Sequence, residues 1–255
     1  MITQRRIFFF ASLTLITSPV LFFFNFDSRT ISSSSFSNLI LFFFIFSIYF
    51  FLSSSLTDPG FIRKRFEPEN FCGDFHADHI SETFNGHVFL RKWCPSCHLY
   101  RPLRARHCRE CDNCVYRFDH HCPWIDNCVG ARNHRSFILF IASTATLSFL
   151  LLISILEVCS IENKTGLFED YLEAMFTYPH RYFVLVLSSL TCMFLTHLTW
   201  YHLNLIGSNL TTLEDLKKCF PSKSPFSTGF RSNCLIFWFT PTPDQTNIEM
   251  NVLNE

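Results

Sequence analysis

The sequence carries no net charge at neutral pH, because its 21 Lys and Arg residues balance its 21 Asp and Glu residues. Proteins that bind DNA or RNA carry a surplus of positive charge, so the composition gives no reason to expect a nucleic-acid partner. Internal repeats are also missing. Charged side chains are missing most clearly from four long apolar stretches, and these stretches decide the class of protein.

The four stretches cover about residues 7–26, 38–56, 136–156 and 182–206, and none has a Lys, Arg, Asp or Glu in its middle. A bilayer is crossed by a helix of about 20 apolar residues, so each stretch predicts a span. The first stretch follows Arg5 and Arg6 and could instead be a signal peptide. It is longer than a signal core and no small-residue cleavage site closes it, which favours the span.

Basic residues predict the orientation of these spans. The loop at residues 57–135 carries twelve Lys and Arg residues, whereas the loop at 157–181 is acidic. Basic loops stay in the cytosol, so both termini and residues 57–135 are expected there. The prediction is a mostly α-helical, polytopic membrane protein. Residues 1–56 hold spans 1 and 2, residues 57–135 a cytosolic domain, residues 136–206 spans 3 and 4, and residues 207–255 a cytosolic tail.

The loop at residues 57–135 contains most of the cysteine. Seven of the twelve cysteines lie between Cys94 and Cys128, at CxxC spacing and mixed with His. This pattern indicates metal binding in a reducing compartment rather than a disulfide framework. Zinc takes four Cys or His ligands, so six Cys and two His would fill two sites and leave one Cys for chemistry. Spacing alone does not say which Cys is left.

Local chemistry favours Cys122 as the remaining thiol. A thiol needs a nearby base to become a thiolate, and a carboxylate can orient that base. Cys122, His120 and Asp119 could supply these roles within four residues. The alternative is that all of these residues are zinc ligands or their supports, and the residues alone leave both possibilities open.

A longer pattern resembles the DHHC family of protein S-acyltransferases. The string at residues 119–124, Asp-His-His-Cys-Pro-Trp, carries the resemblance together with the surrounding Cys and His spacing. Asp-Pro-Gly at 58–60, Asn133 four residues before Phe137, and Thr-Thr-Leu-Glu at 211–214 also match the family's motifs. A looser match lies in the tail at residues 225–233. The segment at residues 102–133 is most similar to the short, four-span animal members.

The resemblance implies roles for individual residues. Cys122 would carry the acyl group, His120 would be the base, Asp119 would orient it, and Trp124 would lie against the acyl chain. Asn133 and the Thr-Thr-x-Glu motif would be structural supports. The resemblance divides the ligands between two zinc ions: Cys94, Cys97, His107 and Cys114 for one, and Cys108, Cys111, His121 and Cys128 for the other.

The implied activity is two-step protein S-palmitoylation, with palmitoyl-CoA or a similar acyl-CoA as donor and cysteine-bearing cytosolic or membrane-associated proteins as acceptors. A membrane-anchored zinc module without catalysis and a zinc-dependent ubiquitin ligase are the rival interpretations. Any single cation that could meet CoA phosphates is more simply a lipid-headgroup or topology charge. These cations are Arg104, Arg106, Arg132 and Arg135.

Other features receive plainer interpretations. His197 and His202 lie in or near the fourth span, where packing is a simpler role than proton transfer. The segment at residues 61–86 has little periodicity and is predicted to be a connector. The second span is short and holds four serines, which suits a thin bilayer, so the Golgi or the endoplasmic reticulum is expected.

Overall fold

The computed structural model describes residues 2–28, 34–65, 78–162, 173 and 176–244. The chain divides into two compact units. The first comprises Met1–Leu52 and Ser136–Tyr201, and the second comprises Ser53–Arg135 and His202–Glu255. Cys72, Asn163 and the end of the predicted tail beyond residue 244 lie outside the described residues.

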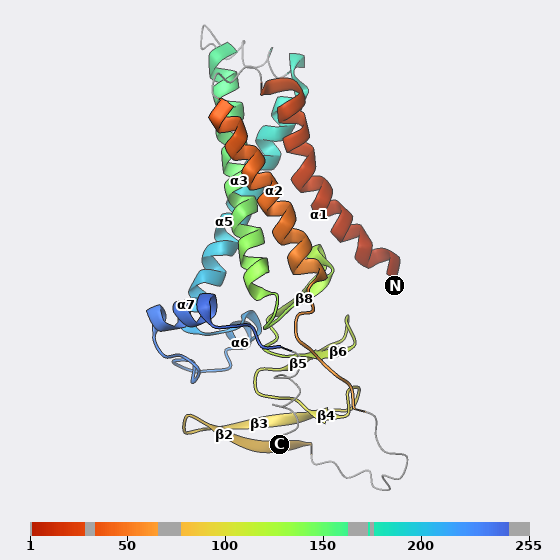
Figure 1. Cartoon of the computed structure of the whole chain (residues 1–255), viewed down its shortest axis with the longest axis vertical. Coiled ribbons are helices and arrows are strands. Elements are labelled where there is room, and N and C mark those ends of the chain that lie inside the picture. Colours follow the sequence, from red (N-terminus) through yellow and green to blue (C-terminus); the bar gives the residue numbers. More distant parts are fainter. Residues whose placement is uncertain (1, 29–33, 66–77, 163–172, 174–175, 245–255) are drawn as a thin grey trace. The chain divides into compact units, whose positions relative to one another are not determined.

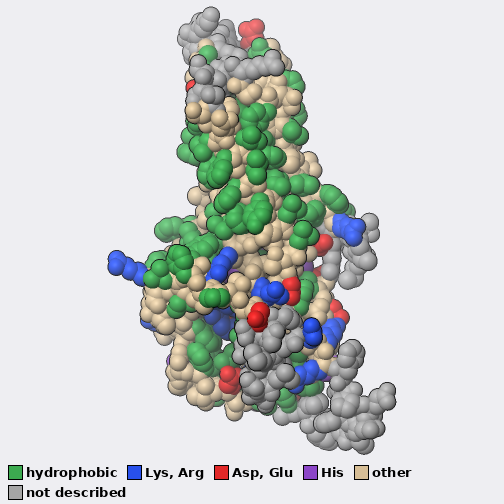
Figure 2. All heavy atoms as spheres, in the orientation of Figure 1, with side chains coloured by type: hydrophobic (Ala, Val, Ile, Leu, Met, Phe, Trp, Pro, Cys, Tyr) green, Lys and Arg blue, Asp and Glu red, His purple; other side chains and the backbone are tan. Residues whose placement is uncertain are grey.

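Four long helices build the first unit, where Figure 1 shows them side by side. Their bounds are α1 Ile2–Phe22, continued by a π-helical turn at Phe23–Asp27, α2 Ser34–Leu56, α3 His134–Glu162 and α5 Pro179–Ser208. All four are long and apolar enough to cross a membrane, which confirms the predicted helices. Figure 2 shows patches of hydrophobic side chains along their visible face.

The first unit packs around α3 and aromatic contacts. In the most apolar stretch of α3, 67% of the residues are buried, a larger share than in the corresponding stretches of the other three helices. Phe51 of α2 is fully buried, and its ring centroid lies 4.9 Å from that of Phe9 and 5.3 Å from that of Phe140. These contacts join α1, α2 and α3 through large side chains that bury much apolar area.

The second unit consists of short strands and two short helices. Three small sheets have the strand orders β1-β6-β5, β2-β3-β4 and β7-β8. Their bounds are β1 Phe61–Ile62, β2 His79–Phe84, β3 His87–Cys94, β4 Leu99–Tyr100, β5 Arg106–Cys108, β6 Asn113–Val115, β7 His120–Cys122 and β8 Asn127–Val129. A 3-10 turn, η2, covers Pro123–Ile125, and helices α6 and α7 cover Thr212–Leu216 and Phe230–Phe239.

The prediction of a connector at residues 61–86 is wrong where the structure describes it. β2 and β3 form an antiparallel hairpin, with Asn85 and Gly86 at its turn. Both have positive φ, 48° and 76°, as a two-residue hairpin turn with Asn-Gly requires. The Asn-Gly pair was a usable signal, but the flanking strands lack a clear apolar alternation.

Buried cysteines form much of the core of the second unit. One cluster combines Cys94, Cys97 and Cys114 with Ile62, Leu99 and Ala105, and a second combines Cys108 and Cys128 with Val115. Sheets of two or three short strands bury little apolar surface, so they need another source of stability. Metal bound by those cysteines would supply it.

Candidate active site and metal centres

Two groups of four side chains gather in the second unit. In the first, the ligand atoms of Cys94, Cys97, His107 and Cys114 all lie within 4.8 Å of one another. His107 Nδ1 lies 3.6 Å from Cys94 Sγ, 3.4 Å from Cys97 Sγ and 3.9 Å from Cys114 Sγ. His107 and Cys114 face each other across β5 and β6, so strand register brings distant residues of the motif together.

The second group comprises Cys108, Cys111, His121 and Cys128. His121 Nδ1 lies 3.5 Å from Cys111 Sγ and 3.6 Å from Cys128 Sγ, and the two sulfur atoms are 3.5 Å apart. His121 and Cys128 are paired across β7 and β8. Each group therefore contains one Cys–His pair set by strand register.

Both groups fit tetrahedral zinc. Zn–S and Zn–N bonds of normal length place neighbouring ligand atoms about 3.6–3.8 Å apart, close to the separations found here. Three thiolates and one imidazole make a closed shell, which is typical of structural zinc. The structure thus contains two Cys/His clusters consistent with two zinc sites.

Strand alternation separates Cys122 from the second cluster. Successive residues of a strand point to opposite faces, so His120 and Cys122 share one face of β7 while His121 points to the other. His121 reaches Cys111 and Cys128 on its face. Cys122 belongs to neither cluster, and its side chain is buried.

Asp119, His120 and Cys122 form a hydrogen-bonded chain. His120 Nδ1 lies 2.7 Å from Oδ2 of Asp119, whose carboxylate is fully buried. Burial opposes a charge on His120, but hydrogen bonds with Asp119 and Cys122 outweigh it and raise the pKa of His120 to about 9. Burial likewise opposes ionisation of Asp119, but the nearby imidazoles of His134 and His120 hold the pKa of its carboxyl below the usual range. An imidazolium beside a carboxylate is therefore the favoured state at neutral pH.

Thr212 anchors the carboxylate from a distant part of the chain. Its backbone N–H donates to Asp119 Oδ1 at 2.8 Å and its hydroxyl donates to Oδ2 at 2.6 Å. Thr212 is the first residue of α6, and the preceding Thr211 caps that helix in a reciprocal capping box with Glu214. The short helix therefore presents Thr212 to Asp119 in a fixed position.

Arg104 ties α6 to the cysteine-rich sheets. Its Nε and Nη2 donate to the two carboxylate oxygens of Glu214 at 2.8 and 2.7 Å. Its Nη1 donates to Asn209 Oδ1 at 2.9 Å, and the guanidinium lies 4.5 Å from the centroid of the Phe226 ring. A two-pronged guanidinium–carboxylate pair is strong and directional. It gives the Glu of the Thr-Thr-x-Glu motif a physical role.

Two asparagines hold the β7–β8 hairpin at the end of α2. Asn127 Nδ2 donates to the carbonyl oxygens of Ser55 and Thr57, each at 2.9 Å. Asn133 Nδ2 donates to Ser54 O at 2.9 Å and to Cys128 O at 2.8 Å. The last carbonyls of a helix lack partners within the helix, and these amides satisfy them.

His134 and His202 lie beside Asp119, although neither was predicted to belong to the site. One polar atom from each, together with a carboxylate oxygen of Asp119, falls within 4.8 Å of the others. Both are buried, and the His202 ring centroid lies 5.9 Å from that of His120. The sequence carried no clear signal for this, since His202 is 83 positions from Asp119 along the chain.

Trp124 and four arginines are the remaining residues that were singled out from the sequence. Trp124 lies in η2 and is 46% exposed. Arg132 donates to Asp58 at 2.7 Å, and Arg135 donates to the backbone oxygens of Phe237 and Thr240. Arg106 and Arg104 line a cavity of about 200 Å³.

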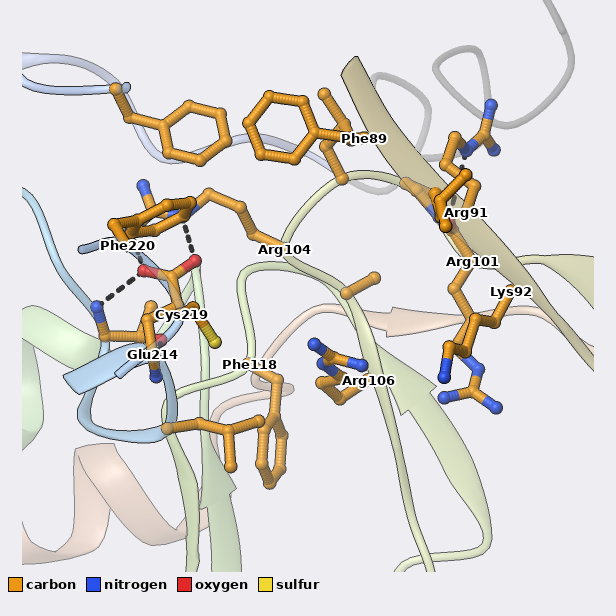
Figure 3. Close-up of a pocket in the computed structure, with 17 residues that line it drawn as sticks. Phe89, Arg91, Lys92, Arg101, Arg104, Arg106, Phe118, Glu214, Cys219 and Phe220 are labelled. Carbon is orange, nitrogen blue, oxygen red and sulfur yellow. Dashed lines mark hydrogen bonds and ion pairs between the residues drawn. The ribbon is translucent and has the colours of Figure 1, made fainter. Parts of the chain in front are cut away.

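That cavity is strongly basic. Among the described residues that line it, the one carboxylate is Glu214, which Arg104 already pairs. Figure 3 shows Arg106, Arg101 and Lys92 across the cavity from the Arg104–Glu214 pair, and Phe89 and Phe220 close by. Arginine, lysine and aromatic rings together suit a phosphorylated ligand with a flat base.

The chain is similar to known proteins over much of its length. A family model described as DHHC palmitoyltransferase matches residues 87–219. Palmitoyltransferase ZDHHC18 of Mus musculus is 35% identical over 266 residues, covering 92% of this chain and 67% of that protein. Palmitoyltransferase ZDHHC9 of Pongo abelii is 33% identical over 271 residues, covering 95% and 72%.

A plant relative matches a smaller part. Probable protein S-acyltransferase 6 of Arabidopsis thaliana is 35% identical over 167 residues, covering 64% of this chain and 40% of that protein. The chain therefore spans between 40% and 72% of the length of these three relatives.

Proposed function

This chain belongs to the DHHC palmitoyltransferase family, and from that premise we propose that it moves a long-chain acyl group from acyl-CoA to Cys122 and then to a cysteine of a substrate protein. One observation carries the proposal. Cys122 is the cysteine in the motif that belongs to neither Cys/His cluster, and it shares a strand face with His120.

In the first step the Cys122 sulfur attacks the thioester carbonyl carbon of acyl-CoA. A new C–S bond forms to Cys122, and the C–S bond to CoA breaks. His120 takes the thiol proton before attack and gives it to the departing CoA thiolate. The hydrogen bond to Asp119 keeps the proton-bearing imidazole oriented, as the carboxylate does in catalytic triads.

In the second step a cysteine thiolate of the substrate protein attacks the acyl–Cys122 thioester. The bond from the acyl carbon to Cys122 breaks, and the free Cys122 is regenerated. His120 can accept the proton of the incoming thiol and return it to Cys122. CoA therefore leaves before the protein product forms, and ping-pong kinetics are expected.

Zinc would be held by the two Cys/His clusters and would supply folding stability rather than chemistry. The strand β7, which carries His120 and Cys122 and directly follows Asp119, also carries His121 of the second cluster and pairs with Cys128 of β8. Filling that cluster would therefore fix the active-site strand. The acyl chain would lie against Trp124, which is 46% exposed.

The basic cavity is our candidate for the phosphate end of acyl-CoA. Three of its cations, Lys92, Arg101 and Arg106, lie on the side away from Glu214. Phe118 also lines it and directly precedes Asp119, so the cavity adjoins the active-site strand. Of the four cations named from the sequence, Arg104 and Arg106 line this cavity, and Arg106 is the one that lies on the side away from Glu214.

The orientation follows from the loop charges. Both termini and the cysteine-rich domain would lie in the cytosol, where acyl-CoA and reduced thiols are found. A Golgi or endoplasmic reticulum membrane is the proposed location. The acceptors would be cytosolic or membrane-associated proteins with accessible cysteines.

Incubation of the purified full chain with labelled palmitoyl-CoA tests the function. We expect label that hydroxylamine removes, and its loss in Cys122→Ser while two zinc ions per chain are retained. Cys234→Ser is the matched control, because Cys234 is a free thiol outside both clusters and outside the basic cavity. Undiminished labelling of the Cys122→Ser variant would refute the assignment.

A further inference from the structure

The chain has four Ser-Pro or Thr-Pro dipeptides, at residues 18–19, 224–225, 240–241 and 242–243. Ser18 lies inside α1, and Ser224 is buried with its hydroxyl donating to Asn209 O at 2.9 Å. Thr240 and Thr242 follow the end of α7 at Phe239, and both are exposed. Thr240 is held at the helix end, because its N–H donates to Ile236 O and its carbonyl oxygen accepts from Arg135, so Thr242 is the more accessible of the two to a modifying enzyme.

The backbone around the two threonines is extended. Thr240 has φ −73° and ψ 134°, and residues 241–244 belong to no helix or strand. Proline disfavours a helical conformation in the residue before it, so Pro241 and Pro243 maintain this shape. Protein kinases bind their acceptor segments in extended form, and one class of them requires proline directly after the acceptor.

The same segment borders a large basic cavity. Residues 240–243 line a cavity of about 660 Å³. Its other polar lining side chains include Arg104, Arg117, His134 and Arg135, and Glu82 is the one carboxylate in the described part of its lining. The cavity belongs entirely to the second unit. A negative charge added to the tail would therefore arise beside several cations.

Arg117 is a buried cation in this cavity whose hydrogen bonding is incomplete. Its Nη2 donates to Asn209 Oδ1 at 3.0 Å, but its buried Nε has no hydrogen-bond partner among the described residues. Burial and the neighbouring charge of Arg104 lower the pKa of Arg117 to about 10. An anion in the cavity would raise the pKa of Arg117 again, because it favours the charged guanidinium. Arg135 already contacts the tail through Thr240 O.

We propose that Thr242 is a phosphorylation site for a proline-directed protein kinase and that its phosphate binds Arg117 and Arg135 in this cavity. The kinase transfers the γ-phosphoryl group of ATP to Thr242. A bond forms between Oγ1 and phosphorus, the bond from phosphorus to the ADP oxygen breaks, and the hydroxyl proton passes to the base of the kinase. Access to ATP requires the tail to lie in the cytosol, as the proposed topology has it.

A phosphate in this position would also reach the acyl-CoA site. Arg104, Leu103 and Phe226 line both the 660 Å³ cavity and the smaller cavity assigned to CoA. A phosphothreonine carries a charge of about −1.5 to −2 and competes strongly for guanidinium groups. Its attraction for Arg104 would weaken acyl-CoA binding. This consequence rests on the proposed function, whereas the modification and its docking do not.

Phosphorylation of the full chain tests the site. After treatment with a proline-directed kinase and ATP, peptide mass spectrometry should place phosphate on Thr242, and Thr242→Ala should lose it. Thr240→Ala is the matched control and should keep it. Absence of phosphate at Thr242 would overturn the proposal.

Phosphatase sensitivity tests the docking without any acyl transfer. The phosphate of the wild-type chain should be removed at least about fivefold more slowly than that of Arg135→Gln, and added salt should narrow the difference. The Arg117→Gln variant should lose its phosphate as quickly as Arg135→Gln does, provided that it retains two zinc ions. Equal rates in the wild type and Arg135→Gln would refute the bound phosphate.

The regulatory effect has its own readout. The KM for palmitoyl-CoA in labelling of Cys122 should rise about fivefold on phosphorylation, and Thr242→Ala should show no such rise. An unchanged KM would refute the coupling through Arg104. A chain that never becomes labelled would count against the proposed function alone, because the phosphatase result would stand.

Discussion

Individual residues around Asp119 connect sequence motifs that are far apart. The carboxylate accepts hydrogen bonds from His120 on one side and from Thr212 on the other. Thr212 is held by α6, and α6 is held by the Arg104–Glu214 pair. The Thr-Thr-x-Glu motif would thus influence the reaction at Cys122 by orienting the carboxylate of Asp119.

Thr212→Val should slow acylation of Cys122 about ten- to a hundredfold, because a hydrogen bond to a charged group contributes about 1.5–3 kcal/mol. The measurement is the single-turnover rate with labelled palmitoyl-CoA. Thr212→Ser is the control, since it keeps both the backbone N–H and a hydroxyl that can donate to Asp119. If Thr212→Ser were as slow as Thr212→Val, the hydroxyl would have no role in orienting Asp119.

His202 offers a second prediction at this scale. An apolar residue there would leave a buried carboxylate facing hydrocarbon, which is costly. His202→Leu should therefore lower the acylation rate at least about tenfold at saturating palmitoyl-CoA, with two zinc ions retained. His202→Gln keeps a polar side chain and should recover part of the rate. Equal rates in the two variants would show that polarity at this position has no role.

The elements of the second unit are too short to be stable by themselves. Its sheets have two or three strands, and its cores are built largely from the cysteines of the two clusters. Structural zinc contributes folding free energy directly, so the sheets and the metal would form together.

Cys97→Ser should accordingly unfold the cysteine-rich sheets rather than slow a single chemical step. Cys97 is fully buried in the first cluster and lies 3.4 Å from His107 Nδ1. We expect fewer than two zinc ions per chain by elemental analysis and rapid proteolysis within residues 57–135. Cys234→Ser should leave both unchanged, because Cys234 lies outside the clusters. Normal zinc content in Cys97→Ser would contradict the ligand assignment.

At the scale of the whole molecule, the orientation in the membrane remains a prediction that two glycosylation sequons can test. Asn209-Leu210-Thr211 is the first. Its Asn209 side chain is bonded to Arg104, Arg117 and Phe226 O, so a glycan there is incompatible with the fold. Asn163-Lys164-Thr165 is the second and is expected in the lumen.

A short polar spacer inserted before Asn163 should bring that sequon within reach of the glycosylation machinery. The expected outcome is a mass shift that endoglycosidase reverses and that Asn163→Gln abolishes. Asn209→Gln should not affect it. A mass shift that depended on Asn209 instead would show that the helices have the opposite orientation. The cysteine-rich domain would then lie in the lumen, where reduced thiolates are not expected.

The sequence by itself determined the four apolar helices, because uncharged stretches of this length have few alternatives to a bilayer. Its Cys and His counts indicated two metal sites and one spare thiol, and the family motifs implied which thiol. Strand register decided the geometry: β7 turns His121 toward its cluster and His120 with Cys122 away from it. Contacts across about 80 to 110 positions brought Thr212, His202 and Glu214 to the site, and no local pattern encodes such contacts.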